Sequence, residues 1–549
     1  MTRLERAEVL VVGSGFAGAI LARALHARGR DVLLVERGTH PRFALGESST
    51  PLANIALERL AATYGFADLR HLAAWGRWRR HLPHLGCGLK RGFTFYAQPT
   101  GSRFELAARN ANRLLVAASP DDEVSDTQWL RADVDAHLVE RAVDEGMRYL
   151  DRCELRSCQI EAGGARCEGM LRRSSGDEAL VVEAAFVVDA SGPGGFLATM
   201  LGIAERVRPA RFSTRLLFAH FDGLPPFSQV EPSPPRADAP AEPFPESWAA
   251  VHHLLDAGWM YQLRFDAGLV SAGFVVDTER EESLGLRLPW GEPERAFGIL
   301  LERYPSLARQ FEHARPRGAI AATGVLQRRL ERAAGERWAV LPQAYAFYSP
   351  LFSTGIAWSL LGVERLAGLL GEGAGCGSLV PAAIEAGLER YSALLEREAD
   401  HQEALLAAAY PLLHDLSRFS AIAQLYFAAA SFGELRQRLL EPSEGGAAEG
   451  WCWQGFLGAT DPLLRAAVEE SPSRAARDGA PSELHRWVRK TIAPRNLIGL
   501  ADPARQNLYP VEIPPLLAAC RRLGLEPAEL ERRLPRLRGG SPVRAEASA

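Results

Sequence analysis

Runs of apolar residues, separated by glycine-rich and polar turns, set the expected order of elements along the chain. Residues 8–12 read Glu-Val-Leu-Val-Val and end at a glycine-rich loop, and residues 16–27 are rich in alanine and leucine. A second apolar run covers residues 31–35. A short apolar run before a glycine turn favours a buried strand, and an alanine- and leucine-rich stretch favours a helix. The first forty residues therefore predict a strand, a tight turn, a helix and a second strand.

Two later runs predict strands that end at polar loops. Residues 88–96 alternate as one strand would, which places Lys90 on one face and Phe93 on the other. Residues 180–188 are rich in β-branched side chains and lead into Asp189-Ala190-Ser191-Gly192. Because ligands of α/β sheets bind at the carboxyl ends of buried strands, this loop is expected to face a ligand.

The remaining pattern predicts a second sheet and a long helical region. The proline-rich stretch 223–247 predicts an exposed loop, and residues 258–265 and 268–276 predict two strands joined by a turn. Helical periodicity begins behind Arg131, returns at 357–370 and continues through 379–440, and the last residues, from about 533, look disordered.

The glycine loop has the spacing of a dinucleotide-binding turn. Gly13 permits the turn, Gly15 allows close approach of a pyrophosphate, and Gly18 allows the helix to pack on the strand. Glu36 ends the second strand, eighteen positions after Gly18, where a carboxylate reaches a ribose hydroxyl. The loop and this strand end supply the expected cofactor-binding residues of the first region: Gly13, Gly15, Phe16, Ala17, Gly18, Glu36 and Arg37.

Composition narrows the class of protein. The net charge of −4 does not favour a nucleic-acid partner, and no apolar run is long enough for a transmembrane helix. No apolar leader precedes the first strand, which favours a cytoplasmic location. The seven cysteines are scattered without metal-ligand spacing, and His252-His253 has no third ligand nearby, so no metal site is expected.

Lysine is nearly absent. Of 63 basic residues only Lys90 and Lys490 are lysines, so arginine fills nearly every place where a bare positive charge would serve. A lysine amine differs from a guanidinium because its pKa can be tuned and its lone pair can react. Lys90 is therefore a candidate for chemistry, although a lysine at a strand edge is the plainer interpretation.

Several motifs, taken in order, resemble those of the flavin-dependent halogenases, and among them the pyrrole- and phenol-type group. They are the glycine loop, Gly46-Glu47-Ser48-Ser49, Lys90 in Leu-Lys-Arg-Gly-Phe, Arg131 before Asp-Val-Asp, His252-His253 before Gly-Trp, and Pro350-Leu351-Phe352-Ser353-Thr354-Gly355. The resemblance covers about residues 7–511 and implies an FAD enzyme.

The resemblance also implies a mechanism and its residues. FAD, reduced by a separate NAD(P)H-dependent flavin reductase, would react with dioxygen and with chloride or bromide, and Lys90 would present the halogen to an electron-rich aromatic substrate, free or bound to a carrier protein. The amides of Thr354 and Gly355 would hold the halide, and Phe93 and Phe352 would contact the substrate. The further residues expected to bind the cofactor are Glu47, Ser48, Ser49, Arg131, Asp189, Gly192, Gly355 and Ile356.

Two residues or motifs depart from the family pattern: the first departure keeps other functions open, and the second argues only against a tryptophan substrate. The tryptophan motif of the family, Trp-x-Trp-x-Ile-Pro, is reduced to Trp259 followed by Met-Tyr-Gln-Leu-Arg, and Phe352 stands where tryptophan halogenases have a glutamate. A related FAD-dependent monooxygenase or dehydrogenase/reductase is the main alternative, and a flavin-binding scaffold without activity is a third.

The fold class expected is α/β, with a Rossmann-like FAD-binding domain, an inserted mixed sheet and a helical C-terminal region. The expected division is 1–222 for the FAD-binding region with Lys90, 223–330 for the substrate-side sheet, 331–378 for the return to the FAD domain, 379–532 for the helical region, and 533–549 for a disordered tail.

Overall fold

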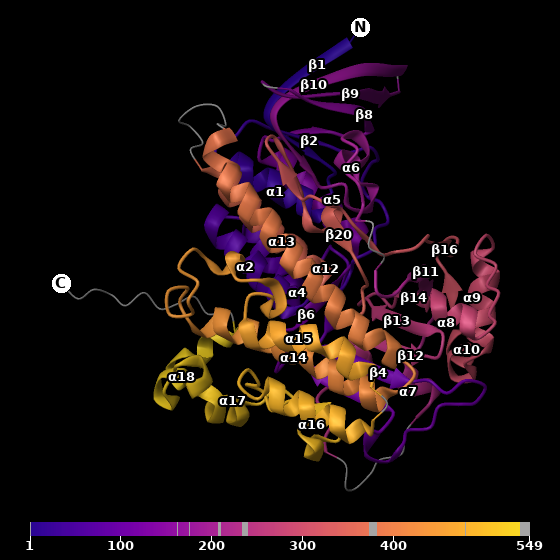
Figure 1. The fold of residues 1–549 in the computed structure, drawn as a ribbon. Coiled ribbons are helices and arrows are strands. Elements are labelled where there is room, and N and C mark those ends of the chain that lie inside the picture. Colours follow the sequence, from indigo (N-terminus) through magenta and orange to yellow (C-terminus); the bar gives the residue numbers. More distant parts are fainter. Residues whose placement is uncertain are drawn as a thin grey trace.

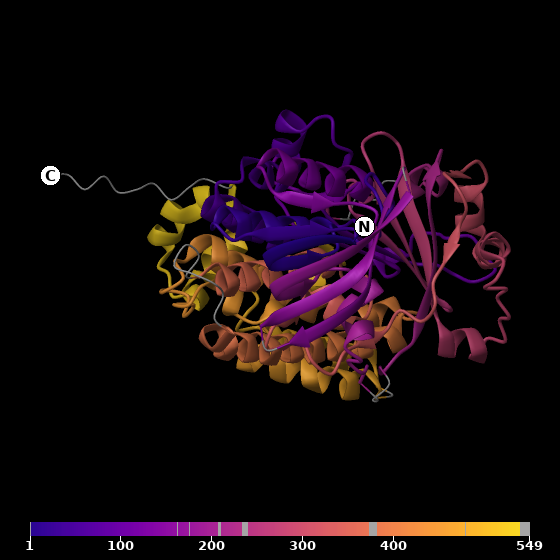
Figure 2. The same ribbon diagram turned by 90° about the horizontal axis from the view of Figure 1, so that it is seen from above.

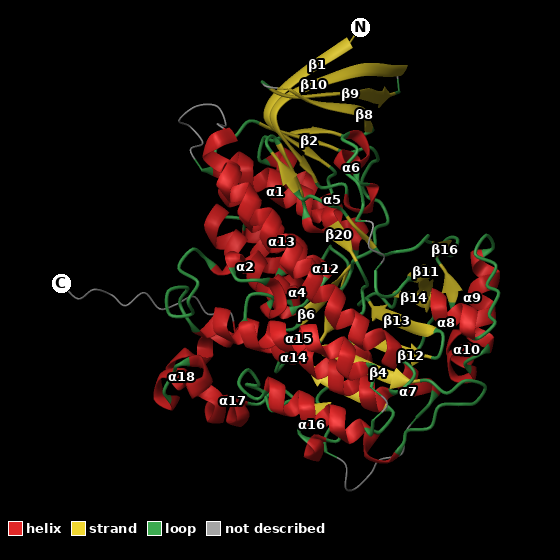
Figure 3. Cartoon of the chain, in the orientation of Figure 1, coloured by secondary structure: helices red, strands yellow, loops and turns green. Residues whose placement is uncertain are grey.

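The computed structural model describes residues 2–161, 163–174, 176–206, 210–232, 240–372, 381–477 and 479–538. Strands gather in two regions, at the top and at the right of Figure 3, and helices fill the space between and below them. The predicted mixed α/β class is confirmed.

The first sheet is centred on the strand that precedes the glycine loop. Val9 of β1 lies opposite Phe186 on one side and Val32 on the other, in parallel register, and all three are buried. This register confirms the predicted return of a strand near residue 186. The sheet runs in the order β18 (Ala334–Gly335), β19 (Trp338–Val340), β10 (Gly176–Asp189), β1 (Thr2–Val12), β2 (Val32–Val35) and β7 (Arg148–Leu150). β9 (Gly164–Arg173) also pairs with β10, and β8 (Cys153–Glu161) pairs with β9.

Helices cover the first sheet and carry the loops at its carboxyl edge. α1 packs against α5 and α12, so the three helices that begin at the candidate site lie together (Figure 1). The helices of this region are α1 (Phe16–Ala27), α2 (Pro51–Tyr64), α3 (Ala67–Leu72), α4 (Trp75–His81), α5 (Arg131–Asp144), α6 (Phe196–Met200), α11 (Pro342–Tyr345) and α12 (Gly355–Gly371).

The second sheet lies beside the first, as the view from above shows (Figure 2). Its order is β15 (Arg315–Pro316), β11 (Thr214–Asp222), β14 (Val270–Asp277), β13 (Gly258–Arg264), β12 (Ala250–Leu255), β4 (Gly92–Ala97), β5 (Arg113–Ala117) and β21 (Leu508–Tyr509), and β16 (Ala321–Ala322) also pairs with β11. Helices α7 (Phe227–Val230), α8 (Thr278–Ser283), α9 (Pro293–Glu302) and α10 (Pro305–Phe311) connect its strands. The predicted hairpin at 266–268 is confirmed by β13 and β14, which pair antiparallel.

The single strand predicted over residues 88–96 is wrong. The structure has two strands, β3 (Cys87–Lys90), which pairs with β6 (Asp126–Trp129), and β4, which belongs to the second sheet. The break falls at Arg91, whose N–H donates to the carbonyl of Trp248 instead of to a neighbouring strand. Lys90 and Phe93 therefore do not face opposite ways, and both are buried.

The helical C-terminal region is confirmed for the described residues after 380. It contains α13 (Pro381–Ala409), α14 (Leu416–Leu439), α15 (Pro462–Ala475), α16 (Pro481–Ile492), α17 (Ile513–Ala519) and α18 (Pro527–Arg533). The pattern is not helix alone, because β21 extends the second sheet beside β5. Part of the proline-rich loop, residues 233–239, and most of the predicted tail, residues 539–549, lie outside the described residues. A further small sheet joins β17 (Arg328–Arg329) to β20 (Ala346–Phe347).

No helix among the described residues is long and apolar enough to cross a membrane. A cytoplasmic location stays a prediction. The domain boundaries given above also stay predictions.

Candidate functional site

The glycine loop between β1 and α1 has room for glycine alone at two positions. Gly13 has φ +102°, and a Cβ there would lie 2.7 Å from the carbonyl oxygen of Ala190. A Cβ on Gly18 would lie 2.0 Å from the carbonyl oxygen of Gly13. These contacts agree with the turn and packing roles predicted for the two residues.

Gly15 is different, because space lies in front of it. A Cβ there would meet only side-chain ends, the nearest being Nη2 of Arg131 at 3.6 Å. Gly15 is also the N-cap of α1, so the helix N-terminus and its N–H groups face this space. Phe16 and Ala17 form the first turn of that helix. A cradle of this kind fits a pyrophosphate.

Arg131 faces the cradle from the start of α5. Its guanidinium forms a bidentate ion pair with Asp135 at 2.8 Å, donates to the carbonyl oxygen of Leu45 at 2.8 Å, and lies 4.7 Å over the ring of Phe16. Asp135 accepts in turn from the N–H of Phe16 at 3.2 Å. Asp135 was not predicted as a site residue, although its i,i+4 spacing from Arg131 could have indicated the pair.

Glu36 is buried at the end of β2 and holds the loop in shape. Its Oε2 accepts from the N–H and hydroxyl of Ser14, and its Oε1 accepts from the N–H of Gly38 at 3.0 Å. Burial opposes ionisation, but these bonds and the charge of Arg42 hold the pKa of the Glu36 carboxyl below its usual range. The bond from Gly38 engages one of the two lone pairs of Oε1, which leaves that oxygen able to accept from a ribose. Arg37 is exposed.

Glu47, Ser48 and Ser49 lie as an extended segment against β6. The N–H of Ser49 donates to the carbonyl of Thr127, Ser48 bridges to Gln128, and Glu47 pairs with His220 at 2.7 Å. The Oγ of Ser353 donates to the Oγ of Ser48 at 3.1 Å. Residues predicted from distant parts of the chain therefore meet here.

The loop after β10 is the neighbour of the glycine loop. Asp189 accepts from the N–H groups of Ser191 and Leu197 at 2.8 and 2.7 Å, and its burial raises the pKa of the carboxyl. Gly192 follows with φ +62°, and its carbonyl accepts from Arg328. Asp189 thus orders this loop through backbone bonds.

The N-terminus of α12 is the place predicted for a halide. Ser353 has φ +53°, Thr354 is the N-cap, and Gly355 and Ile356 begin the helix. The first N–H groups of a helix have no partner within it and attract anions. Phe352, just before, is buried and stacks on Tyr426 of α14 with ring centroids 4.5 Å apart.

Lys90 is completely buried. Its Nζ donates to the carbonyl oxygen of Ser49 at 2.5 Å and lies 4.2 Å over the ring of Phe93. Burial lowers the pKa of the Lys90 amine to about 8, against the opposing charge of Asp126. The amine therefore keeps a usable neutral form near neutral pH, as a reactive lysine requires.

Phe93 connects Lys90 to a cavity of about 620 Å³. The cavity lies between β4 and α14 and is also lined by Ile513 at the start of α17, Glu531 of α18 and residues that follow α18. Its lining is mostly apolar, and its polar side chains are Ser431, Glu434 and Glu531. Burial raises the pKa of the Glu434 carboxyl, which pairs with Arg438 at 2.9 Å.

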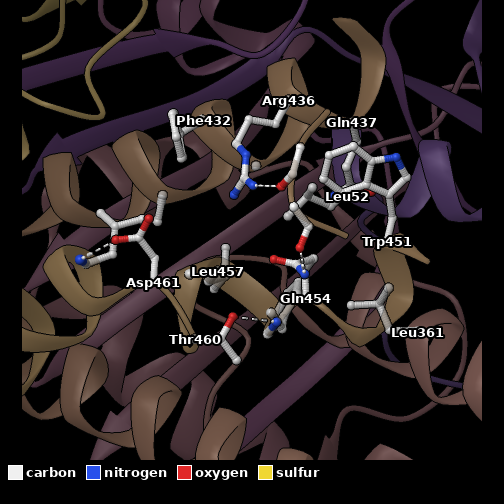
Figure 4. A pocket seen from close by; sticks show the side chains of 18 of the residues that line it. Leu52, Leu361, Phe432, Arg436, Gln437, Trp451, Gln454, Leu457, Thr460 and Asp461 are labelled. Carbon is white, nitrogen blue, oxygen red and sulfur yellow. Dashed lines mark hydrogen bonds between the residues drawn. The ribbon is translucent and has the colours of Figure 1, made fainter. Parts of the chain in front are cut away.

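A second cavity, of about 280 Å³, lies on the opposite face of α14 (Figure 4). Arg436 donates to the carbonyl of Gly445, Gln454 to that of Gly446, and the N–H of Gly455 donates to Thr460. Its polar groups thus bind the loop that forms its wall. The larger cavity is lined by Phe93, which Lys90 contacts, and is the better candidate for a reaction.

Trp259, His252 and His253 are buried in the core. Trp259 is buried, and its Nε1 donates to the hydroxyl of Tyr410 at 3.1 Å. His252 stacks between Phe95 and Trp259, and burial together with the nearby charge of Lys90 lowers its pKa to about 3. His252 is therefore a neutral histidine that packs against aromatic rings in the core.

Comparison with known proteins identifies the family. The FAD dependent oxidoreductase family matches residues 8–315. The chain belongs to this family. The expected FAD cofactor and the expected enzyme class are confirmed by this match.

The relatives within the family are halogenases. The chain is 24% identical to monodechloroaminopyrrolnitrin halogenase PrnC of Pseudomonas fluorescens over 78% of this chain and 72% of the relative. It is 27% identical to tetracycline 7-halogenase of Kitasatospora aureofaciens over 64% and 60%. The crystal structure of halogenase PltM in complex with phloroglucinol and FAD superposes with a TM-score of 0.78 at 20% identity, covering 91% of this chain and 99% of that one. The predicted resemblance to flavin-dependent halogenases is confirmed, while the roles of the single site residues stay predictions.

Proposed function

We propose that this FAD-dependent oxidoreductase is a halogenase that uses chloride or bromide on an electron-rich aromatic substrate of the phenol or pyrrole type. The observation that carries the proposal is the buried amine of Lys90, which lies over Phe93 beside a mostly apolar cavity. Three relatives support it by their names: monodechloroaminopyrrolnitrin halogenase, tetracycline 7-halogenase, and a brominase from Pseudoalteromonas luteoviolacea that is named for a pyrrole carried on a peptidyl-carrier protein.

The residues of the first region fit FAD. The open space before Gly15 would take the pyrophosphate at the N-terminus of α1, and the free acceptor of Glu36 Oε1 would take the ribose. Arg131 would lie beside the phosphates, with Asp135 holding its orientation. Bound and reduced FAD supplies, with dioxygen and halide, the oxidised halogen. A separate NAD(P)H-dependent flavin reductase is the proposed partner.

Residues of this chain would hold the halide and then move the halogen. The amides of Thr354 and Gly355 would bind the anion at the N-terminus of α12. The lone pair of neutral Lys90 would take the halogen from hypohalous acid and present it at Phe93, and Phe352 would help to form the aromatic wall beside Tyr426.

The cavity selects against anions. Its charged lining side chains are the carboxyl groups Glu434 and Glu531. A carboxylate-bearing substrate would be repelled by Glu531, because the described lining holds no cationic side chain, whereas a phenol hydroxyl or pyrrole N–H could donate to Glu434, which Arg438 holds in place. Neutral aromatic donors are therefore the proposed substrate class.

The deciding experiment incubates the enzyme with FAD, a flavin reductase, NADH, halide and a panel of phenols, pyrroles and their benzoate analogues. Mass spectrometry should find the chlorine or bromine isotope pattern in a neutral substrate and not in the carboxylates. Lys90→Ala should abolish this product while FAD binding and flavin reoxidation continue, and Lys90→Arg should fail as well because a guanidinium stays protonated. A Lys90→Ala enzyme that still halogenates would refute the role of Lys90.

A monooxygenase is the second candidate. The altered motif favours it, because Trp259 is hydrogen-bonded to Tyr410 in the core, and Tyr261, Leu263 and Arg264 stand where the family motif has Trp, Ile and Pro. A product that gains oxygen without any dependence on halide, or NADH consumption by the purified protein alone, would establish this alternative.

A further inference from the structure

Lys90 has a buried carboxylate directly across from it. In the antiparallel pair of β3 and β6, Lys90 is the register partner of Asp126. Lys90 is 0% exposed and Asp126 is 1% exposed. Burying two opposite charges is costly because each must leave water, and only their mutual attraction and further hydrogen bonds offset that cost.

A chain of hydrogen bonds runs from Lys90 through Ser49 and Asn54 to Asp126. Lys90 Nζ donates to the carbonyl oxygen of Ser49, and the hydroxyl of Ser49 donates to Asn54 Oδ1 at 2.9 Å. Asn54 Nδ2 donates to Asp126 Oδ1 at 2.7 Å. The other oxygen of Asp126, Oδ2, is buried and has no hydrogen-bond partner among the described residues. The carboxylate is thus fixed by one oxygen, and the other is left to accept a proton.

We propose that Asp126 is the proton partner of Lys90 and that its carboxyl holds the proton which the amine gives up when it takes a halogen. This inference rests on the proposed halogenase function. The hydrogen bonds from Ser49 to Asn54 and from Asn54 to Asp126 hold the carboxylate across from the amine. The amine can therefore transfer its proton to Asp126 instead of to solvent.

The proton balance closes within the pair. The ammonium and carboxylate first become amine and carboxylic acid. The amine nitrogen then bonds to the halogen of hypohalous acid, the halogen–oxygen bond breaks, and the acid of Asp126 protonates the departing hydroxide to water. Attack by the aromatic ring breaks the nitrogen–halogen bond, the freed amine takes the ring proton, and that proton returns the pair to its starting state. The net change is replacement of ring hydrogen by halogen with formation of water.

The charges around the pair set its pH range. Burial raises the pKa of Asp126 to about 7, and burial lowers that of Lys90 to about 8. Glu434 and Arg438 from α14 act on Asp126, Tyr426 lies near it, and His252 from β12 stays neutral beside Lys90. Below this range both groups carry a proton, and above it neither does. Halogen transfer should therefore have a bell-shaped pH dependence.

The scarcity of lysine makes Lys90 directly observable. Lys490 is exposed on α16, so Lys490→Arg leaves a chain with Lys90 as its one lysine. In this background, ¹⁵Nζ-lysine labelling gives one amine signal to titrate by NMR. Asp126→Asn keeps the acceptor for Asn54 but removes the charge that raises the lysine pKa, so the titration midpoint should fall by at least one pH unit. Asp144→Asn, at the last and exposed residue of α5, is the matched control and should leave the midpoint unchanged.

Activity gives the second readout. Asp126→Asn should bind FAD and release peroxide as the parent does, yet lose at least tenfold in halogenated product. Its pH profile should keep an acid limb, because the amine must still lose its proton, and should lose the basic limb, because the carboxyl that supplies a proton is absent. If Asp126→Asn does not fold, Asn54→Ala decides, because loss of its bond to the carboxylate should also lower the Lys90 midpoint. A Lys90 titration unchanged in the folded variants would overturn the inference. A parent without halogenated product would instead refute the proposed function, and the NMR titration would still decide the pairing.

Discussion

Alanine substitutions in the glycine loop should separate cofactor binding from folding. At Gly15 the added Cβ would meet only side-chain ends at 3.6 Å or more, which is ordinary contact. At Gly18 it would meet the carbonyl oxygen of Gly13 at 2.0 Å and Ala190 Cβ at 2.9 Å. Gly15→Ala should therefore fold as the parent does and fill the pyrophosphate space, whereas Gly18→Ala must move the backbone.

The expected cost to folding at Gly18 and the expected loss of FAD stabilisation at Gly15 can both be given a size. Overpacking in a core costs about 1–3 kcal/mol, and a fixed backbone oxygen at 2.0 Å puts Gly18→Ala at or above the top of that range. FAD at 100 times its Kd stabilises the parent by about 2.7 kcal/mol, and each tenfold loss of affinity removes about 1.4 kcal/mol. We expect Gly15→Ala to weaken FAD binding at least tenfold, and the variant should therefore lose about half or more of the stabilisation that FAD gives the parent.

Thermal unfolding with and without FAD, together with a flavin fluorescence titration, measures both effects. Gly368→Ala is the matched control, because Gly368 is exposed in α12 with nothing near its would-be Cβ, and it should stabilise by about 0.5–1 kcal/mol while binding FAD normally. If Gly15→Ala bound FAD like the parent, the pyrophosphate assignment would be wrong. If Gly18→Ala were as stable as the parent, the packing argument would fail.

Two further predictions concern stability. Arg365 and Glu398 are both fully buried and paired at 2.6 Å, so Arg365→Met should cost about 3–5 kcal/mol in urea unfolding, and Arg365→Met with Glu398→Gln should cost less, because no lone charge remains. Burial lowers the pKa of His401 to about 4. Between pH 6.5 and 4, His401 therefore binds a proton in the unfolded chain but not in the folded chain. The unfolding free energy should fall by about 1.4 kcal/mol per pH unit between 6.5 and 4 on account of His401, and His401→Gln should remove that slope; an equal slope in both proteins would contradict the assignment.

The first forty residues could be interpreted from the sequence because their structure is local. The apolar run, the glycine spacing and the alanine-rich helix each follow from neighbouring residues, and β1, α1 and β2 lie where this pattern predicts them. The meeting of Ser353 with Ser48 could be expected only from the family resemblance. The hydrogen bond between them depends on how α12 and β6 are brought together, which no local pattern encodes.

The error at residues 88–96 has a different cause. Alternation continues through Arg91, so periodicity alone gives one strand. The chain instead changes sheets, because glycines on either side let it approach other strands closely. A Cβ on Gly88 would lie 1.9 Å from the carbonyl of Arg264, and one on Gly92 would lie 2.1 Å from that of Val116. Both glycines stood in the predicted strand, but their partners are remote in sequence.

The break between β3 and β4 is what brings the reactive groups together. A continuous strand would have set Lys90 and Phe93 on opposite faces, with the amine away from the aromatic wall. With the chain turned at Arg91, the amine lies over Phe93, and β3 is left free to pair with β6, which brings Asp126 across from Lys90. Sequence reasoning found the lysine because of its rarity, but Asp126 is one of many acidic residues and gained its meaning only from the strand register. The same break thus places the amine across from its proton partner and against Phe93, which lines the cavity.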